Sequence, residues 1–349
     1  MVTLKDIADK AGVSSMTVSR ALNGRSKDIS QKTAEKIKKI AEEMGYIPNS
    51  SAKALASHSS KLIAAMLMDY PWDPNPLVDS YNSAFFGELA REIQKNGYDL
   101  MLHYIKDYSE VNYCLKSWKV AGAVFIGFFD DNIRQIQEDN HIPLVFTDSY
   151  STVRRITNVG IDDFHGGELA AGYLLSKGHT ELAARYLLSK GHRNLAFIGP
   201  EAIGNGVIMH RLQGFCSYLR EAGVHLSPEH IINLTGQDMK EIIKTLKKGP
   251  RPVTGIFTTA DNCAFDIYAA AHHLGYQVPE DLSVIGFDDN SMSSRVIPPL
   301  TTIRQDICRK ARITCEILMK KIQDPKSPAE NIILDVELAE RESVRDLSL

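Results

Sequence analysis

The N-terminal residues alternate apolar and polar positions with a helical period, which predicts three short helices. Thr3 and Asp6 have the spacing of a reciprocal helix cap, and Gly12 suits the end of the first helix. The second helix is expected over 16–22 and the third over 30–44. Their inward positions are Leu4, Ile7, Ala8, Ala11, Val18, Ala21, Leu22, Ile37, Ile40, Ala41 and Met44. The first two helices, joined by a tight Ala-Gly-Val-Ser turn, form a helix-turn-helix unit.

From Leu62 onward the pattern changes to apolar runs of strand length, separated by helical stretches such as 84–96. The runs are "KLIAAMLMDY", "YDLMLHY", "AGAVFIGF", "IPLVFTD", "NLAFIGP", "GIFTTAD" and "LSVIGFDD". Strands that alternate with helices predict a parallel sheet with helices on both faces.

A thirteen-residue segment occurs twice in succession, as 168–180 and 181–193, and the copies differ only at their fifth and last positions. Thirteen residues turn a helix by about 1300°, which leaves roughly 220° after three full turns. The two copies would therefore present different faces in one straight helix. We expect one copy to pack against the sheet, and the sequence does not decide which.

The predicted second helix leaves a polar face that suits contact with DNA. Ser15, Thr17 and Ser19 are short donors for phosphate oxygens. Arg20, with Met16 beside it, can donate a pair of hydrogen bonds to a guanine edge in the major groove. The alternative is an ordinary three-helix bundle with a solvated face, and the row of short donors favours the DNA interpretation.

Charge is distributed unevenly along the chain. Residues 1–60 hold ten Lys and Arg against six Asp and Glu, a net charge of +4, whereas the whole chain carries −3. A basic arm on an acidic body indicates that the arm alone meets a polyanion. Charge by itself fits a solvated helical surface equally well.

Composition narrows the class of protein. At 349 residues, two or three domains are expected. No apolar run has the length of a membrane span, and the first residues lack the order of a secretory signal. The five cysteines are scattered without a CxxC pair, which argues against a disulfide framework and a zinc site. We expect a cytoplasmic protein with reduced thiols and without a metal or cofactor.

Several strands are followed by residues that could line a binding site, because ligands of parallel α/β sheets bind beyond the carboxyl ends of the strands. These residues are Asp69, Tyr70, Phe128, Asp148, Pro200, Asp261 and Asp288. Carboxylates there can accept the paired hydroxyls of a sugar. Arg211 can offer a fork of donors, and Tyr70 or Phe86 can stack on a ring. The alternative is that some of these carboxylates cap helices or brace loops.

No motif for catalysis stands out. The chain contains no GxxxxGK[ST], GxSxG or HExxH, and no GxGxxG follows the first strand. "GPEAIGNG" is rich in glycine but lacks lysine, so a loop is the better interpretation. We therefore expect no enzymatic activity.

Taken together, the motifs resemble the lactose-repressor (LacI/GalR) family of bacterial regulators. The resemblance rests on "TLKDIADKAGVSSMTVSRALNG", "YIPNSSAKALAS", "VAGAVFIG", "IPLVFTDS", "GHRNLAFIGP", "RLQGF", "VPEDLSVIGFDD" and "PPLTTIRQD", which stand in the family's order over nearly the whole chain. It implies an all-α helix-turn-helix headpiece with a hinge helix, then an α/β two-lobed periplasmic-binding-protein-like domain with parallel sheets. The implied boundaries are 1–48 for the headpiece, 49–60 for the hinge and 61–349 for the two lobes, the first over about 61–160 and 292–322 and the second over about 161–291 and 323–349.

The resemblance also implies which residues contact DNA. The base-reading positions are Ser15, Met16 and Arg20, and the phosphate-contact positions are Thr3, Thr17, Ser19 and Asn23. The hinge helix matches Asn49 to Ser57, where Leu55 would wedge between base steps of the minor groove. Ala52 and Lys53 flank that wedge.

The positions that the resemblance places at or beside an effector pocket are Asp148, Asp162, Arg211, Asp261 and Asp288. Ala260 stands where many sugar-responsive members carry Asn, so a particular sugar cannot be transferred to this chain. The implied function is that of a homodimeric regulator, a repressor whose affinity for double-stranded operator DNA depends on a small sugar-like effector. Whether the effector is an inducer or a corepressor stays open.

Two other classes of protein fit parts of the sequence. A cytoplasmic solute-binding protein would fit the lobes alone, but the headpiece and the missing export signal argue against transport. A sugar-modifying enzyme with a regulatory arm would need catalytic motifs that the chain lacks.

Overall fold

The structure is a computed structural model that describes residues 2–22, 29–47, 60–69, 75–128, 130–151, 153, 155–176, 194–200, 206–250 and 252–347. It contains two compact units, Met1–Ser60 and Lys61–Leu349. No helix in the described part of the chain combines the length and the apolar character that crossing a bilayer requires.

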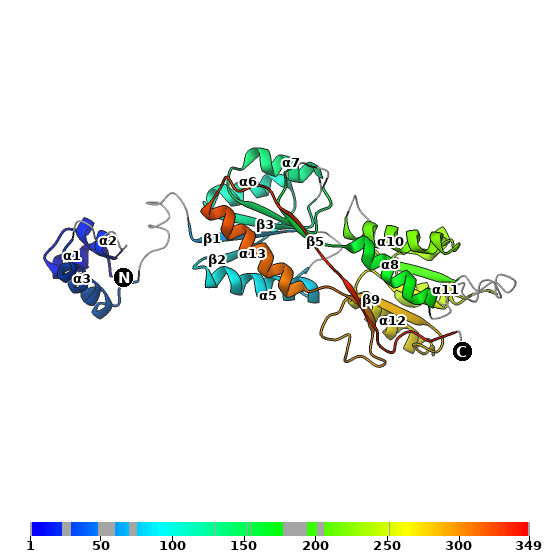
Figure 1. Cartoon of the computed structure of the whole chain (residues 1–349). Helices are drawn as coiled ribbons and strands as arrows, with labels where there is room; N and C mark the ends of the chain where they lie inside the picture. Colours follow the sequence, from blue (N-terminus) through cyan, green and yellow to red (C-terminus); the bar gives the residue numbers. More distant parts are fainter. Residues whose placement is uncertain are drawn as a thin grey trace. The chain divides into compact units, whose positions relative to one another are not determined.

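The N-terminal unit is a three-helix bundle (Figure 1). Its helices are α1 (Leu4–Ala11), α2 (Ser15–Leu22) and α3 (Gln31–Glu43). The Thr3 hydroxyl accepts from the Asp6 amide and the Asp6 carboxylate accepts from the Thr3 amide, so the expected reciprocal cap forms. Gly12 ends α1 with a φ of 73°, a conformation that glycine adopts at little cost. Ile7, Val18 and Ile37 are fully buried between the helices.

The first lobe of the second unit is a parallel six-stranded sheet in the order β11-β5-β4-β3-β1-β2. Its strands are β1 (Leu62–Met68), β2 (Asp99–Ile105), β3 (Gly122–Ile126), β4 (Leu144–Thr147), β5 (Asn158–Ile161) and β11 (Asn331–Leu334). The helices of this lobe are α5 (Ser80–Lys95), α6 (Tyr108–Ser117), α7 (Asp130–Asp139) and α13 (Ile307–Gln323). Helices α5 and α13 cover one face of the sheet, and α6 and α7 cover the other.

The second lobe contains a six-stranded sheet in the order β12-β10-β9-β8-β6-β7, parallel except for β12. Its strands are β6 (Leu195–Gly199), β7 (Ile231–Asn233), β8 (Gly255–Thr258), β9 (Ser283–Asp288), β10 (Thr301–Arg304) and β12 (Glu337–Ala339). Its helices are α8 (Asp163–Leu174), α10 (Val207–Glu221), η3 (Pro228–His230), α11 (Met239–Leu246) and α12 (Asp261–His273). Helices α8 and α10 pack on one face, and α11 and α12 pack on the other.

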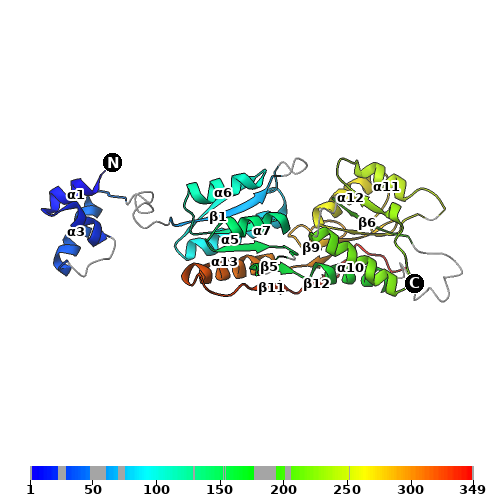
Figure 2. The same cartoon turned by 90° about the horizontal axis from the view of Figure 1, so that it is seen from above.

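The chain passes between the lobes three times: after β5, after β10 and again between β11 and β12 (Figure 2). The predicted lobe boundaries differ from this arrangement at two places. Residues 292–304 were assigned to the first lobe, but β10 pairs with β9 of the second. Residues 323–334 were assigned to the second lobe, but β11 pairs with β5 of the first. Strands of four residues carry no local signal for the sheet they join.

Helices α8 and α10 approach each other backbone to backbone. A Cβ atom added to Gly167 would overlap the carbonyl oxygen of Arg211, and one added to Gly214 would overlap that of Phe164. Only glycine fits at these two contacts, and their closeness brings the start of α8 beside the middle of α10.

The first copy of the tandem repeat contributes to α8. Ala170, Ala171 and Leu174 are fully buried in the core of the second lobe. The second copy, 181–193, lies outside the described residues. The copy that packs against the sheet at this place is therefore the first.

Candidate nucleic-acid interface and inter-lobe site

The exposed face of α2 carries the side chains predicted to contact DNA. Met16 is 64% exposed, and Ser15 and Arg20 are exposed beside it. Val18 lies on the opposite face of α2 and is fully buried. The burial pattern therefore leaves the predicted base-reading positions open to solvent, as docking in a major groove requires.

Two of the predicted phosphate contacts take part in helix capping: Thr3 caps α1, and Thr17 bonds to Ser14, which caps α2. The Thr3 hydroxyl donates to the Asp6 carboxylate at 2.8 Å. Thr17 donates its amide to the Ser14 hydroxyl at 3.1 Å, and the two hydroxyls lie 2.9 Å apart. These hydroxyls lie at the N-termini of α1 and α2, where backbone amides and the helix dipole favour an anion.

A chain of polar side chains runs across the two lobes (residues 148, 310, 305 and 288). The ammonium of Lys310, on α13, donates to both carboxylate oxygens of Asp148 at 2.8 and 2.9 Å. It also donates to the Gln305 oxygen at 3.1 Å, and the Gln305 amide donates to Asp288 at 2.6 Å. Tyr81 donates to Asp148 at 2.5 Å. Because Lys310 is only 1% exposed, this network connects the lobes through buried groups.

Asp148 and Asp288 both have a positive backbone φ, of 53° and 112°. Each follows or ends a strand, β4 in the first lobe and β9 in the second. Such conformations are costly for a residue other than glycine, and they tend to occur where the surrounding structure holds a functional group in place.

A second polar cluster is centred on Arg211. Its Nε donates to the buried Asp163 at 2.6 Å, and another of its nitrogens donates to the Thr259 carbonyl. The guanidinium carbon lies 3.5 Å from the centre of the Phe287 ring. Tyr150, from the first lobe, donates to the same Asp163 carboxylate. Arg211 is therefore held by an ion pair within the second lobe, and a tyrosine of the first lobe donates to the carboxylate of that pair.

The lobes also touch through two amide side chains. Asn262 donates to the Asp79 carboxylate at 2.9 Å, and Asn290 donates to the Ser80 hydroxyl at 3.0 Å. Both acceptors lie at the start of α5, and both donors belong to the second lobe. These contacts are single hydrogen bonds, so they can separate and become hydrated when the lobes move.

Two cavities open at the junction of the lobes. One of about 670 Å³ is lined by residues that include Ser80, Asp288, Asn290, Arg304 and Gln305. The other, of about 360 Å³, lies beside Tyr150, His210 and Asn331, among others. Both volumes lie within the range of small-molecule sites.

Known proteins match this chain over nearly its whole length. Residues 3–49 match the family described as "Bacterial regulatory proteins, lacI family", and 184–344 match a "Periplasmic binding protein-like domain". The HTH-type transcriptional regulator DegA of Bacillus subtilis is 32% identical over 363 residues, which cover 99% of each chain. The chain belongs to the lacI family of bacterial regulatory proteins.

Two further relatives agree with this lacI-family assignment. The HTH-type transcriptional repressor CytR of Escherichia coli is 29% identical and covers 99% of this chain and 97% of its own. The lac repressor dimer, solved with operator and the anti-inducer ONPF, has a TM-score of 0.79 at 26% identity over 99% of each chain. This lacI-family chain is thus a DNA-binding transcriptional regulator with a helix-turn-helix headpiece and a two-lobed body.

The structure of this lacI-family protein brings three of the predicted effector residues near the junction of the lobes: Asp148, Arg211 and Asp288. Asp162 instead caps α8, because its carboxylate accepts from the His165 amide at 2.9 Å. Phe86 packs in the core of the first lobe and is only 6% exposed.

Asp261 of the lacI-family body is fully buried and is held by three hydrogen bonds from the protein itself. Its carboxylate accepts from Thr302 and Ser293 at 2.6 Å and from the Asn290 amide at 2.8 Å. Burial raises its pKa to about 6. The structure therefore favours the alternative stated for such residues, in which a carboxylate braces a loop.

Several predicted residues lie outside the described part of this lacI-family chain. They are Asn23, Asn49, Ala52, Lys53, Leu55 and Tyr70.

Sequence reasoning missed five side chains of the junction, namely Tyr81, Tyr150, Asp163, Gln305 and Lys310. Tyr150 lies three residues beyond β4, so a wider use of the strand-end rule would have found it. Asp163 adjoins the predicted Asp162. Lys310 lies within a helix, where a lysine usually indicates a solvated face.

We expect the stability of this lacI-family regulator to depend on pH, because the pKa of the Asp288 carboxyl is raised in the folded state. Burial raises its pKa to about 8, although the charge of Arg211 opposes the shift. A carboxyl whose pKa is raised on folding contributes stability that is full below about pH 3.9 and is lost as the pH rises toward the folded value. Each such group changes the free energy of unfolding by at most about 1.4 kcal/mol per pH unit.

We expect Asp288→Asn to flatten the decline in stability between about pH 5 and about pH 8. The amide imitates the protonated acid, and its oxygen can still accept from Gln305. Urea unfolding of both proteins across this range measures the slopes. An unchanged slope in the variant would show that Asp288 does not retain its proton on folding.

Proposed function

We propose that this chain is a homodimeric transcriptional repressor whose affinity for operator DNA depends on a sugar-like molecule bound between its lobes. The supporting observation is the polar network through Lys310, which joins the carboxyl groups of Asp148 and Asp288 across the junction. A polyol inserted there would exchange these internal hydrogen bonds for bonds to its hydroxyls. The distance between the two lobes would then change.

The control of DNA binding follows from this exchange. A ligand shifts a two-state equilibrium only as far as it binds one state better than the other. The direct contacts of Asn262 and Asn290 with α5 belong to the arrangement described here, so a ligand that needs a wider gap would compete with them. Acting on chromosomal DNA, the protein would work in the cytoplasm, and the proposal includes no catalytic step.

The test is binding of the full chain to DNA with and without candidate effectors. Fluorescence anisotropy would follow labelled DNA from the controlled region, and a thermal-shift screen of sugars and sugar acids would identify ligands of the native state. We expect one such ligand to raise the melting temperature and to change the affinity for DNA. If no fragment binds at low salt in any liganded form, a solute-binding role replaces this proposal.

Arg20→Gln is expected to weaken specific DNA binding by about 1–3 kcal/mol, because a paired contact to a base edge is lost. The control is Arg220→Gln, which removes the same charge from an exposed position on α10. Anisotropy titrations on specific and random duplexes separate the two kinds of loss. If both variants bind specific DNA like the wild type, Arg20 does not read a base.

A further inference from the structure

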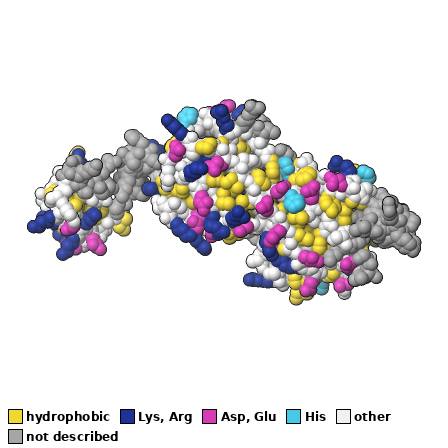
Figure 3. All heavy atoms as spheres, in the orientation of Figure 1, with side chains coloured by type: hydrophobic (Ala, Val, Ile, Leu, Met, Phe, Trp, Pro, Cys, Tyr) yellow, Lys and Arg dark blue, Asp and Glu magenta, His cyan; other side chains and the backbone are white. Residues whose placement is uncertain are grey.

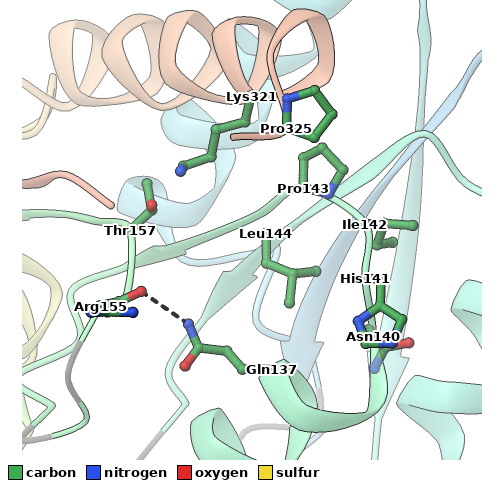
Figure 4. A pocket seen from close by; sticks show the side chains of 10 residues that line it. All are labelled: Gln137, Asn140, His141, Ile142, Pro143, Leu144, Arg155, Thr157, Lys321 and Pro325. Carbon is green, nitrogen blue, oxygen red and sulfur yellow. Dashed lines mark hydrogen bonds between the residues drawn. The ribbon is translucent and has the colours of Figure 1, made fainter. Parts of the chain in front are cut away.

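A further pocket lies in the first lobe, and it shares Arg155 with the 360 Å³ cavity at the junction. Its cavity of about 190 Å³ is enclosed by the end of α7, the residues that lead into β4 and β5, and the end of α13 (Figure 4). The residues around it are Gln137, Asn140, His141, Ile142, Pro143, Leu144, Arg155, Thr157, Lys321 and Pro325. The volume is below the 300–1,000 Å³ typical of drug-sized ligands, so the pocket suits a small group.

The side chains around this pocket carry only one sign of charge. Lys321, Arg155 and His141 can each be cationic, and no Asp or Glu lines the cavity. The larger cavity between the lobes differs, because five of its lining residues are acidic. Figure 3 shows acidic and basic side chains interspersed over the visible face of the α/β body, whereas this pocket and the 360 Å³ cavity at the junction are both lined without a carboxylate.

Thr157 supplies a hydroxyl donor on the wall of the pocket. Its side chain is 3% exposed, and within the described residues its hydroxyl makes no hydrogen bond. The oxygen of this hydroxyl is itself accessible, because in the described part of the chain the buried side-chain polar atoms without a partner are His210 Nε2 and Ser327 Oγ. The hydroxyl can therefore donate to a group bound in the cavity.

Lys321 and Arg155 leave donors available beside that hydroxyl. The Lys321 ammonium donates to the carbonyls of Ser327 and Pro328 at 3.4 and 3.1 Å, which leaves one of its three hydrogens for the pocket. The Arg155 guanidinium forms no hydrogen bond or ion pair with any described residue. The Gln137 amide donates to the Arg155 carbonyl at 3.4 Å and so ties this segment to α7 (Figure 4).

We propose that this pocket binds the phosphate group of a small phosphomonoester or of inorganic phosphate. Lys321 and Arg155 would neutralise its charge, and the Thr157 hydroxyl would donate to one oxygen. A tetrahedral anion can accept from these donors on several sides at once. Burial lowers the pKa of Lys321, and an adjacent dianion would oppose that shift.

The experiment uses the full-length protein with inorganic phosphate, glycerol 3-phosphate, glycerol and chloride at equal ionic strength. Isothermal titration and the rise in melting temperature both report binding. We expect both phosphates to bind and glycerol and chloride to have no effect. Tighter binding of glycerol 3-phosphate than of inorganic phosphate would identify an ester as the better ligand, and equal binding would identify the free ion.

Three variants locate the site: Lys321→Gln, Thr157→Val and the exposed Arg155→Gln. Each is expected to weaken phosphate binding by about tenfold, as the loss of a charged or buried hydrogen bond does. Lys320→Gln is the matched control, because Lys320 pairs with Glu330 at 2.8 Å and does not line the pocket. The proposal fails if neither phosphate binds, or if Lys320→Gln weakens binding as much as Lys321→Gln.

Discussion

Replacing Gly214 by alanine is expected to lower the free energy of unfolding by about 3 kcal/mol, which is among the largest effects of adding one methyl group. The added carbon would overlap the carbonyl oxygen of Phe164 on α8. A backbone atom cannot turn aside as a side chain can, so α8 and α10 must separate. Arg211 lies one turn before Gly214 on α10, and its contact with Asp163 would loosen together with the helices.

Gly87→Ala provides the matched control for this variant. Gly87 lies within α5, is exposed and has no atom within 4 Å of an added Cβ. Alanine there should stabilise the protein by about 0.5–1 kcal/mol, because glycine costs entropy in a helix. Urea unfolding of both variants measures the two changes. Equal stability of Gly214→Ala and the wild type would show that the helices do not pack so closely.

The second large effect is expected from Asp163→Asn, which should destabilise the protein by about 3 kcal/mol. Asp163 is fully buried, and Arg211 is 7% exposed. The amide preserves the shape but removes the charge, so the guanidinium would remain buried without a counter-ion. Because its contact with the Asp163 carboxylate would be lost, Arg211 would be less firmly positioned, and any ligand that it holds would bind less tightly.

The control for this pair is Glu241→Gln on α11. Glu241 forms an ion pair with Lys244 at 2.6 Å, and these two side chains are 67% and 49% exposed. Its loss should cost less than about 1 kcal/mol, since exposed pairs contribute little. A double-mutant cycle with Arg211→Gln isolates the coupling of the buried pair, which is expected to be about 0.5–3 kcal/mol. A coupling near zero would contradict the burial argument.

The helices of the headpiece could be predicted from sequence because their signals are local. The cap of Thr3 with Asp6 and the left-handed Gly12 both form as expected. The ends of the other helices move by one residue, to Ser15 for α2 and to 31–43 for α3. The alternation of strands and helices likewise predicted the parallel sheets.

The assignment of segments to lobes could not be predicted equally well. β10 and β11 are short strands, and the sheet that each joins depends on residues far away in the chain. The strand-end rule led to Asp148 and Asp288, but it could not distinguish them from Asp261, whose carboxylate is taken up by loop residues. Lys310 was not predicted as a site residue, because no local feature of the sequence distinguishes a buried lysine from a solvated one.

Helix α13 carries both Lys310, in the network between the lobes, and Lys321, at the pocket of the first lobe. The two positions are eleven residues apart, or roughly 16 Å along one continuous helix. A tilt of α13 that favours one site alters the other as well. If bound phosphate changes the affinity for the sugar by some factor, then the bound sugar must change the affinity for phosphate by the same factor. A single helix would thus couple the binding of two metabolites in this protein.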